Sequence, residues 1–530
     1  MIINPENPDR PLSWPQRCAH LESENAALRE RVRWLEEQIR LAQQRRFGAS
    51  SERSDATQLH LFNEAEAEAA SAVEAPAEHE TITYQRKKKT PGQRDAALQH
   101  LPTERIEYRL PPEEQQCSAC MGPLHEMGEE VRRELQVIPA TIKVVEHVRM
   151  KYSCRTCEEQ ALKTPIVTAP MRRPVYPGSL ASASLLAHIL HQKFTLGLPL
   201  YRQEQDWARL GVPLSRQTMA NWVMFAAQEW LAPLYQILHD RLRQRDILHA
   251  DETALQVLHE DGRAAETQSY MWLYRTGRDA PAIVLYEYQK TRGKEHPKKF
   301  LDGFKGYLQV DGYAGYHDLP AIILVGCFAH VRRYWMEALQ TIPKADRAGP
   351  SLARVGLDFC NRLFAVERDL REKNPAERRD GRRVRSAPIL AAFHAWLIGQ
   401  QPQVVPKSAT GRAITYTLNQ WPALQTFLED GRLEIDNNRA ERSIKPFVIG
   451  RKGWMFANAP RGARASAMTY SIVETAKENG LNPQAYLQYL FEELPNRDLT
   501  NPAIWEDLLP WSPQLPDRVR SPQSGPDASR

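Results

Sequence analysis

Three acidic residues that lie far apart in the sequence follow patterns that could bring their carboxylates together. A short apolar stretch typical of a buried strand ends at Asp251, and a second ends at Asp311, just before a glycine that allows a sharp turn. Glu441 follows capping residues and stands among helix formers, which predicts a place in the first two turns of a helix. A single aspartate at a strand end is ordinarily a turn or an ion pair. Three carboxylates on two strands and a helix could instead hold a pair of divalent metal ions.

Such a metal pair suits the cutting and rejoining of a phosphodiester. Two ions about 3.5 to 4 Å apart bind both the attacking and the leaving oxygen. Carboxylates are suitable ligands because Mg2+ or Mn2+ prefers hard oxygen donors. We expect Asp251 to bridge both ions, with Asp311 on one ion and Glu441 on the other.

Neighbouring acidic residues compete for these roles. Glu252 is adjacent to the first aspartate, but on a strand it points to the opposite face. Asp436 is better placed as a helix cap, and Glu434 is a weaker alternative for the third ligand.

Residues 245–345 predict the first part of a catalytic core built on a mixed sheet. The predicted strands cover 247–258, 269–276, 282–288, 307–311 and 322–327. Short turns join the first three strands, and longer connections lead to the last two. In that order the first and fourth strands would lie side by side at the sheet centre, and so would their carboxylates. This is the ribonuclease H-like arrangement.

Helices are predicted on the C-terminal side of this sheet. The expected parts are a helical insertion at 346–430, the catalytic helix with the third carboxylate and a basic-aromatic segment at 431–460, C-terminal helices at 461–510 and a disordered tail at 511–530. The basic-aromatic segment begins at Arg451 and Lys452 and suits stacking on, or clamping, a nucleic acid strand. The tail is rich in Pro and Ser, which predicts disorder.

Residues 15–48 predict a coiled-coil helix that dimerises the chain. Apolar residues recur in alternate steps of four and three, with leucines at one heptad position and Asn25, Val32 and Ile39 at the other. This choice favours a parallel two-stranded coiled coil, with an amphipathic helix packed on its own domain as the alternative. We therefore expect a homodimer or a higher oligomer. Residues 49–100 lack apolar periodicity and predict a linker with a basic run.

Residues 101–170 predict a zinc ribbon that binds nucleic acid. Two Cys-x-x-Cys pairs supply four thiolates, which satisfy a closed, structural Zn2+ site. The duplicated spacing favours zinc over a redox motif, which needs one pair, and over an iron–sulfur site, which usually has another spacing. The four predicted ligands are Cys117, Cys120, Cys154 and Cys157.

Residues 178–244 predict a helical region that contains a helix-turn-helix. A helix beginning after Ser215 would bury apolar residues on one face and present polar residues on the other, which suits a DNA major groove. An ordinary helical hairpin fits the same pattern. The side chains expected to contact DNA are Arg216, Gln217 and Asn221 in this helix, His330, Arg332 and Arg333 after the last strand, and Arg451 and Lys452 after the third carboxylate.

The composition fits a multidomain α+β protein without a membrane span. With 530 residues the chain is too long for one ordinary core. Its net charge of only +5 confines any nucleic-acid surface to a local patch. The first residues are polar, and no apolar run approaches the about 20 residues that a membrane span requires. Paired cysteines favour a reducing compartment, so we expect a cytoplasmic, nucleoid-associated protein that binds no membrane.

In these motifs the chain resembles the transposases of the insertion sequence 66 family. The resemblance covers nearly the whole chain in order: the zipper, Phe47-Gly48-x-x-Ser51-Glu52, the cysteine ribbon, the helix-turn-helix, His249-Ala-Asp-Glu-Thr253, Asp311-Gly-Tyr-Ala-Gly-Tyr316, Cys327-Phe-Ala-His-Val-Arg-Arg333, Asp436-Asn-Asn-Arg-Ala-Glu441 and Arg451-Lys452. It implies a DDE-type enzyme with Asp251, Asp311 and Glu441 as its triad. The implied substrate is double-stranded DNA, both the terminal inverted repeats of the enzyme's own element and the target.

Two departures from the family pattern are visible. Gly453 stands where the family usually has asparagine, and Met121 separates Cys120 from the glycine that usually follows it directly. Neither departure touches a carboxylate.

Two other functions stay open on the sequence alone. A nuclease or resolvase of the same fold would cleave without joining ends, and a metal-independent DNA-binding regulator would bind whether or not the carboxylates are intact. The carboxylate spacing and the basic-aromatic segment argue against the regulator. The sequence also leaves open which DNA ends are read and whether accessory proteins of the same element are needed.

Overall fold

The computed structural model describes residues 3–4, 7–11, 14–47, 141–153, 166–278, 281–347 and 349–522. The chain divides into two compact units, one formed by Met1–His79 and Pro174–Ser521 and the other by Glu80–Arg173 and Pro522–Arg530. The predicted linker at 49–100 and the four ribbon cysteines lie outside the described residues. Within the described part, none of the helices combines the length and the apolar character that crossing a bilayer requires.

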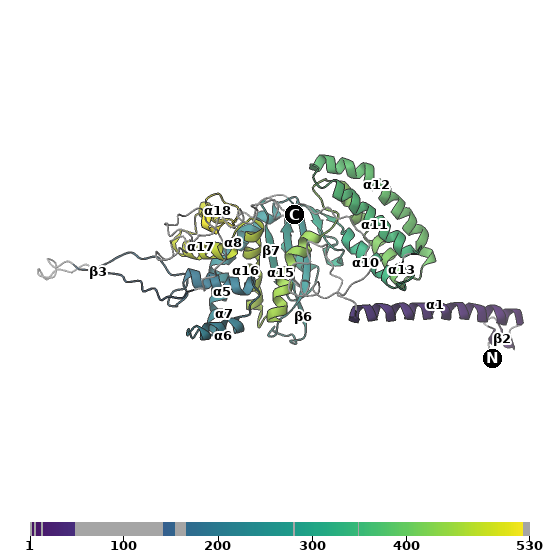
Figure 1. The fold of residues 1–530 in the computed structure, drawn as a ribbon, viewed down its shortest axis with the longest axis horizontal. Coiled ribbons are helices and arrows are strands. Elements are labelled where there is room, and N and C mark those ends of the chain that lie inside the picture. Colours follow the sequence, from purple (N-terminus) through teal and green to yellow (C-terminus); the bar gives the residue numbers. More distant parts are fainter. Residues whose placement is uncertain are drawn as a thin grey trace, which may run out of the picture. The chain divides into compact units, whose positions relative to one another are not determined.

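A five-stranded mixed sheet forms the centre of the larger unit (Figure 1). Its strands are β5 (Ile247–Gln256), β6 (Gln268–Thr276), β7 (Val284–Gln289), β8 (Gly306–Gln309) and β9 (Ile322–Val325). Their order is β7-β6-β5-β8-β9, in which β5, β6 and β7 are antiparallel and β8 and β9 run parallel to β5. The first and fourth strands in chain order, β5 and β8, are therefore neighbours in the sheet, as the sequence pattern predicts.

The register of the central parallel pair decides where the carboxylates lie. His249 of β5 pairs with Gln309 of β8. Asp251 and Asp311 each follow two residues after a member of this pair. The two aspartates therefore occupy equivalent positions on adjacent, parallel stretches of chain.

Helix α16 (Pro460–Glu478) covers the outer edge of β7. An edge strand leaves backbone N–H and C=O groups without a strand partner. Here Val284 N donates to Thr475 Oγ1 (3.0 Å), Thr475 Oγ1 donates to Val284 O (3.0 Å), and Tyr286 N donates to Ser471 Oγ (2.8 Å). Hydroxyl side chains on one face of α16 thus replace the missing strand. Helix α15 (Asn438–Trp454) packs on β5 and β6.

A group of helices precedes the sheet, in the region predicted to contain the helix-turn-helix. They are α5 (Ala183–Phe194), α6 (Leu200–Arg209), α7 (Arg216–Ala226), the π-helical turn η3 (Ala227–Leu231) and α8 (Ala232–Arg243). Ser215 caps α7 by accepting a hydrogen bond from Thr218 N (3.1 Å), as predicted. Met219, Trp222 and Val223 are buried, so the apolar face of α7 packs inward.

The region between the sheet and α15 is helical and has its own core. Its elements are α10 (Phe328–Gln340), α11 (Leu352–Asp369), α12 (Pro375–Gln400), η5 (Gln401–Gln403), α13 (Ala409–Asn419), α14 (Trp421–Gln425) and η6 (Thr426–Leu428). Trp335, Phe393 and Phe427 are buried in this second core. Arg378 and Arg382 of the basic cluster in α12 are also buried, and both pair with Glu367 (3.4 and 2.7 Å). These two arginines therefore hold the insertion together.

The C-terminal part packs against the main core. It comprises α17 (Pro483–Glu493), η7 (Leu494–Asn496), α18 (Pro502–Leu508) and η8 (Asp517–Val519). The expectation of disorder from residue 511 is wrong for 511–522, while 523–530 lie outside the described residues. Leu515 and Val519 are buried, and Asn482 N donates to Val519 O (2.8 Å). The Pro- and Ser-rich composition predicts disorder because it does not take account of these two apolar residues, which pack in the core.

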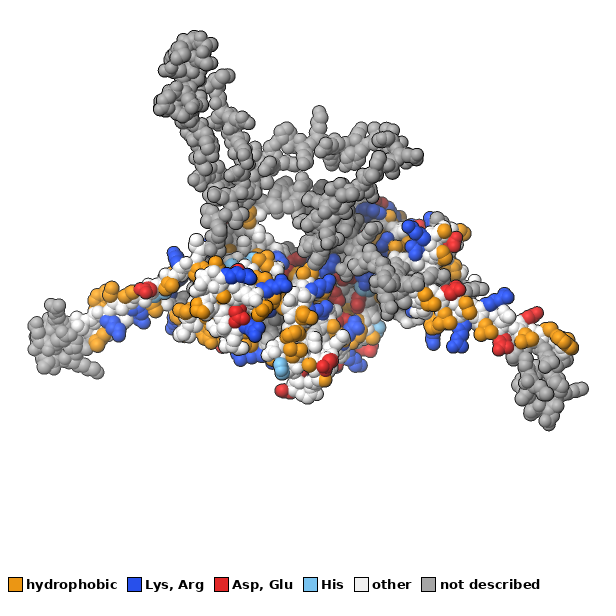
Figure 2. All heavy atoms as spheres, turned by 60° about the horizontal axis from the view of Figure 1, so that its bottom comes forward, with side chains coloured by type: hydrophobic (Ala, Val, Ile, Leu, Met, Phe, Trp, Pro, Cys, Tyr) orange, Lys and Arg blue, Asp and Glu red, His pale blue; other side chains and the backbone are white. Residues whose placement is uncertain are grey.

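Helix α1 (Trp14–Phe47) follows the short strands β1 (Ile3–Asn4) and β2 (Asn7–Pro11). Hydrophobic side chains are visible along it in Figure 2. The predicted heptad residues are about half exposed in the single chain: Leu21, Leu28, Val32, Leu35 and Ile39. A row of exposed apolar residues on a long helix is typical of a surface that packs against a partner.

The smaller unit is described in part. Strand β3 (Lys151–Tyr152) pairs antiparallel with β4 (Val167–Thr168). Residues 141–150, between the two cysteine pairs, are exposed and form no strand. Two short elements of the larger unit complete the inventory: α9 (Glu295–Phe300) and η4 (Ala314–Tyr316).

Candidate active site

Strand β5 presents Asp251 to helix α15. Successive side chains of a strand alternate between faces, and two same-face neighbours of Asp251 contact α15 or its N-cap: His249 bonds Asn437, and Thr253 accepts a hydrogen bond from Arg451 Nη1 (3.3 Å). Glu252 lies on the other face, where its carboxylate accepts a hydrogen bond from the Tyr316 hydroxyl (2.6 Å) and pairs with Arg292 (Nε to Oε1, 2.9 Å). Glu252 is therefore engaged by Tyr316 and Arg292, although its charge also raises the pKa of Asp251.

A tight turn after β8 positions Asp311. Its Oδ1 accepts a hydrogen bond from Tyr313 N (3.0 Å), and its backbone carbonyl accepts one from the Tyr416 hydroxyl of α13. Gly312 has a φ of 101°, and a Cβ there would lie 2.8 Å from Gln420 Cδ and 3.0 Å from the Tyr416 hydroxyl. Only glycine fits this close approach. The helical insertion thus supports the turn that carries the second aspartate.

Glu441 lies in the first turn of α15, as its sequence context predicts. His330 Nδ1 lies 3.6 Å from its Oε1, and Arg333 Nη2 lies 3.8 Å from its Oε2. Among the described residues, the buried Oε1 atom has no hydrogen-bond partner. His330 and Arg333, predicted to contact phosphate, therefore lie beside the third carboxylate.

The pKa of Asp251 depends on its burial and on the acidic residues around it. Burial raises the pKa of Asp251 well above its usual value, and the negative charges of Glu252, Asp311 and Glu441 raise it further. Like charges act in this way only at short range. The charges of Asp311 and Glu441 thus reach Asp251, and a cation bound to Asp251 would offset this repulsion.

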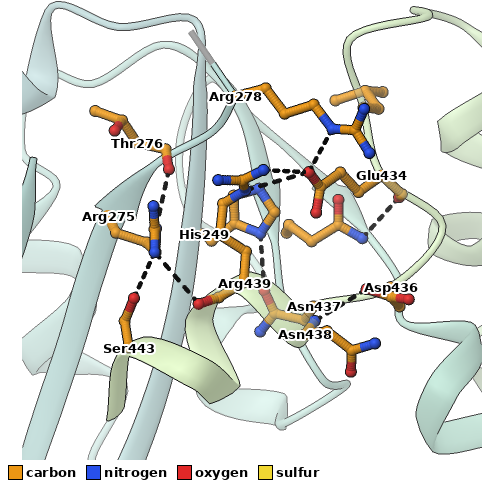
Figure 3. A network of polar contacts seen from close by, with 12 residues as sticks. His249, Arg275, Thr276, Arg278, Glu434, Asp436, Asn437, Asn438, Arg439 and Ser443 are labelled. Atoms are coloured by element: carbon orange, nitrogen blue, oxygen red, sulfur yellow. Dashed lines mark hydrogen bonds and ion pairs between the residues drawn. The ribbon is translucent and has the colours of Figure 1, made fainter. Parts of the chain in front are cut away.

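A buried polar network fastens the start of α15 to the sheet (Figure 3). Asn437, the N-cap residue, donates from Nδ2 to Ala250 O (2.8 Å), and its Oδ1 lies 3.0 Å from His249 Nδ1. Since the amide nitrogen faces the carbonyl, Oδ1 accepts, and His249 carries its proton on Nδ1. Burial lowers the pKa of His249 to about 4, so this imidazole is neutral at pH 7.

Glu434 belongs to the same network and is not available as a third metal ligand. Its Oε1 accepts hydrogen bonds from Arg278 Nε (2.7 Å) and Arg439 Nη2 (2.9 Å). Burial opposes ionisation of Glu434, but these arginines outweigh it and hold its pKa below the usual value. Asp436 accepts a hydrogen bond from Asn438 N (3.0 Å), so it acts at the helix start, although Asn437 is the N-cap residue.

The other residues expected to contact DNA are distributed over several surfaces. On α7, Arg216 is exposed and lies 3.9 Å from Glu204, while Gln217 Nε2 donates to Asn221 Oδ1 (3.1 Å). Arg332 turns to the insertion and donates to Asn361 Oδ1 (2.9 Å), so it does not join His330 beside the carboxylates.

The basic-aromatic segment is the last part of α15. Arg451 lies beside β5 through its bond to Thr253, and Lys452 is exposed. Trp454 packs edge-on against Phe447, with 5.5 Å between the ring centroids, so its ring contributes to the core. This packing argues against stacking of Trp454 on a nucleic acid strand.

Sequence reasoning missed the residues that hold the carboxylates. The sequence pattern predicts Asp436 as the helix cap, gives Asn437 no separate role, and does not single out Tyr416. Asn437 stands directly before the helix, where an amide can bond to a neighbouring element as well as to its own helix. Tyr416, 105 positions after Asp311, gave no local signal.

An open hollow of about 440 Å³ lies next to the third carboxylate. His330, Arg333, Tyr334, Glu337 and Arg412 line it. Tyr334 stacks on Tyr416, with ring centroids 4.4 Å apart, so the hollow also adjoins the residue that holds the Asp311 carbonyl. Two arginines and an aromatic ring offer contacts for a phosphate and a base.

Four segments of the chain match known protein families. Residues 178–465 match the family described as "Transposase IS66 family", and 114–158 match the "zinc-finger binding domain of transposase IS66". Residues 34–106 match "Transposase C of IS166 homeodomain", and 471–511 match the "IS66 C-terminal element".

Two relatives from Sinorhizobium fredii extend the likeness, although both are described as uncharacterized. Protein y4jD is 33% identical over 429 residues, which cover 78% of this chain and 80% of that protein. Protein y4qI is 31% identical over 516 residues, which cover 93% of this chain and 91% of that protein. With its central family match, zinc-finger match and C-terminal match in order, the chain belongs to the IS66 transposase family.

Proposed function

We propose that the chain is a DDE-type transposase with a ribonuclease H-like core. It cleaves DNA at the inverted repeats of an insertion sequence and joins the ends to target DNA, using two Mg2+ or Mn2+ ions. Asp251, Asp311 and Glu441 would hold these ions. The observation that carries this proposal is the parallel register of β5 and β8, which gives the two aspartates equivalent positions on adjacent segments of the chain.

The donor set fits divalent metal ions. Burial raises the pKa of Asp251, and the charges of the other two proposed ligands, Asp311 and Glu441, are among those that raise it further; the buried Oε1 of Glu441 has no hydrogen-bond partner in the described structure. Hard oxygen donors of this kind suit Mg2+. When bound, the ions would activate the attacking oxygen and stabilise the leaving oxygen.

The chain's own residues orient this site. Asn437 ties the start of α15 to the strand residue before Asp251, and the Tyr416 hydroxyl holds the carbonyl of Asp311. Arg333 and Arg412, in the hollow beside Glu441, would bind phosphates of the DNA strand. Together these contacts would hold the DNA strand in position relative to the carboxylates.

DNA recognition and assembly use other parts of the chain. The exposed face of α7, with Arg216, Gln217 and Asn221, would enter a major groove. The four ribbon cysteines would hold one structural Zn2+. The exposed apolar row of α1 would form a coiled coil between two chains, and the protein would act in the nucleoid as a homodimer or a higher oligomer.

The test is cleavage of duplex DNA that carries the element's terminal repeats, with Mg2+, by the full chain and by Asp251→Asn. We expect unchanged DNA binding and at least about a hundredfold slower cleavage, because the variant replaces one of the three proposed carboxylate ligands with a neutral amide. Asp246→Asn is the matched control, since Asp246 is 69% exposed and pairs with Arg432. Cleavage that persists in Asp251→Asn, or without divalent ions, would contradict the proposal. Cleavage without joined products would favour a nuclease or resolvase.

A further inference from the structure

Cys327, His330 and Glu441 bring a thiol, an imidazole and a carboxylate to one point. Cys327 precedes α10, His330 lies in its first turn, and Glu441 lies in the first turn of α15. His330 Nδ1 is 3.4 Å from Cys327 Sγ and 3.6 Å from Glu441 Oε1. In the described part of the chain, the ligand atoms of all three lie within 4.8 Å of one another.

These distances match the edges of a zinc tetrahedron. Zinc binds sulfur at about 2.3 Å and nitrogen or oxygen at about 2.0 to 2.2 Å, so two ligand atoms in a tetrahedral site are about 3.4 to 3.6 Å apart. The measured pairs, 3.4 and 3.6 Å, lie in this range. The third pair, sulfur to oxygen, is also short enough to close with a small side-chain movement.

The surroundings of Cys327 suit a metal-bound thiolate. The side chain is buried, and Sγ accepts a hydrogen bond from Asn437 N (3.1 Å), at the positive end of α15. The carboxylate partner is equally prepared, because Glu441 Oε1 is buried and has no hydrogen-bond partner among the described residues.

We propose that Cys327, His330 and Glu441 form a zinc site with an open fourth position. Sulfur and imidazole select Zn2+ over Mg2+, which prefers oxygen. Binding forms the zinc–sulfur bond and releases the thiol proton to water. His330 must then carry its own proton on Nε2, so Arg333, whose Nη1 lies 3.4 Å from this atom, turns away; its side chain is 57% exposed.

The site shares one carboxylate with the proposed Mg2+ pair. Zinc on Glu441 removes that ligand from the pair, so Zn2+ and Mg2+ compete. This consequence rests on the proposed function, whereas the zinc site itself does not.

The experiment measures bound zinc by elemental analysis after the full-length chain is dialysed against buffered free Zn2+. We expect Cys327→Ser and His330→Ala each to hold one Zn2+ per chain fewer than the wild type, with at least about a hundredfold weaker binding. Cys360→Ser is the matched control, because Cys360 is also a buried free thiol but belongs to α11 in the insertion. It should hold as much zinc as the wild type. Subtraction removes any zinc held by other cysteines.

Replacement of Zn2+ by Co2+ gives a second readout. A thiolate-to-cobalt charge-transfer band should lose intensity in Cys327→Ser but not in Cys360→Ser. Equal zinc content in the wild type, Cys327→Ser and His330→Ala would overturn the proposal. Thermal melting checks the fold, and if Cys327→Ser fails to fold, the more exposed His330→Ala decides the question. None of these readouts depends on DNA cleavage, so failure here differs from failure of the proposed function.

Discussion

Replacing Asn437 with alanine should loosen the start of α15 from the sheet. The Asn437 side chain links β5 to the start of the helix that carries Glu441, and it makes two buried hydrogen bonds, to His249 Nδ1 and to Ala250 O. Asn437 and His249 are each 1% exposed, so water cannot replace the lost partner. The alanine variant therefore leaves one donor and one acceptor unsatisfied.

The expected cost follows from the two orphaned groups. A buried donor or acceptor that loses its partner costs about 1 to 3 kcal/mol, so the variant with two such groups should lose about 2 to 6 kcal/mol of stability. Because 1 kcal/mol shifts Tm by about 2 to 4 °C in a sizeable domain, we expect Tm to fall by at least about 4 °C. A displacement of Glu441 by about 1 Å should also slow DNA cleavage about a hundredfold.

Thermal melting and cleavage of terminal-repeat DNA measure the two effects. Asn438→Ala is the matched control, because the Asn438 side chain makes neither bond and only its backbone N–H bonds Asp436. Asn437→Asp separates the two hydrogen bonds, since an ionised carboxylate can accept from His249 but cannot donate to Ala250 O. We expect it to be at least as damaging as alanine.

The reasoning would be refuted by a variant that behaves like its control. If Asn437→Ala melts and cleaves as Asn438→Ala does, the network does not position the helix. A double-mutant cycle with His249→Ala adds a further check, because two residues that bond each other should show an interaction energy of about 0.5 to 3 kcal/mol.

Three further predictions concern other parts of the chain. Burial raises the pKa of Glu287 to about 7 from 4.5, so ionisation of this carboxyl lowers the free energy of unfolding; the effect is absent below about pH 4.5 and complete above about pH 7. Glu287→Gln should therefore increase the free energy of unfolding at pH 8 by up to about 3 kcal/mol, with a higher Tm. At pH 4.5 the variant should melt nearly as the wild type does. Gly312→Ala should lower stability by at least about 1 kcal/mol and slow cleavage, because its Cβ meets Gln420 and Tyr416 at a φ of 101°; equal melting and cleavage would show that the turn can move. Leu28→Glu places a charge in the exposed apolar row of α1 and should shift the chain towards monomer in analytical ultracentrifugation, whereas an unchanged mass would exclude the coiled coil as the dimer contact.

The sequence predicted the elements that depend on local patterns. Strand-like stretches, the Ser215 cap and the first-turn position of Glu441 are encoded within a few residues, and the structure confirms them. The neighbouring placement of the first and fourth strands was also predicted, because chain order and connection lengths restrict the pairing. The tail beyond residue 511 was misjudged, since composition averages over the two apolar residues that anchor it.

Contacts over long sequence separations needed the tertiary structure. Tyr416 supports Asp311 from 105 positions away, and Asn437 bonds a strand residue 187 positions earlier. Arg332 turns to the insertion while His330, two residues earlier, lies beside Glu441, a difference that the motif alone does not contain. Side-chain types and local spacing are written in the sequence, so it determined which residues carry charge and which elements hold them. Their partners depend on packing between distant segments, so only the folded chain decided which acidic groups are already neutralised by arginine and which repel one another.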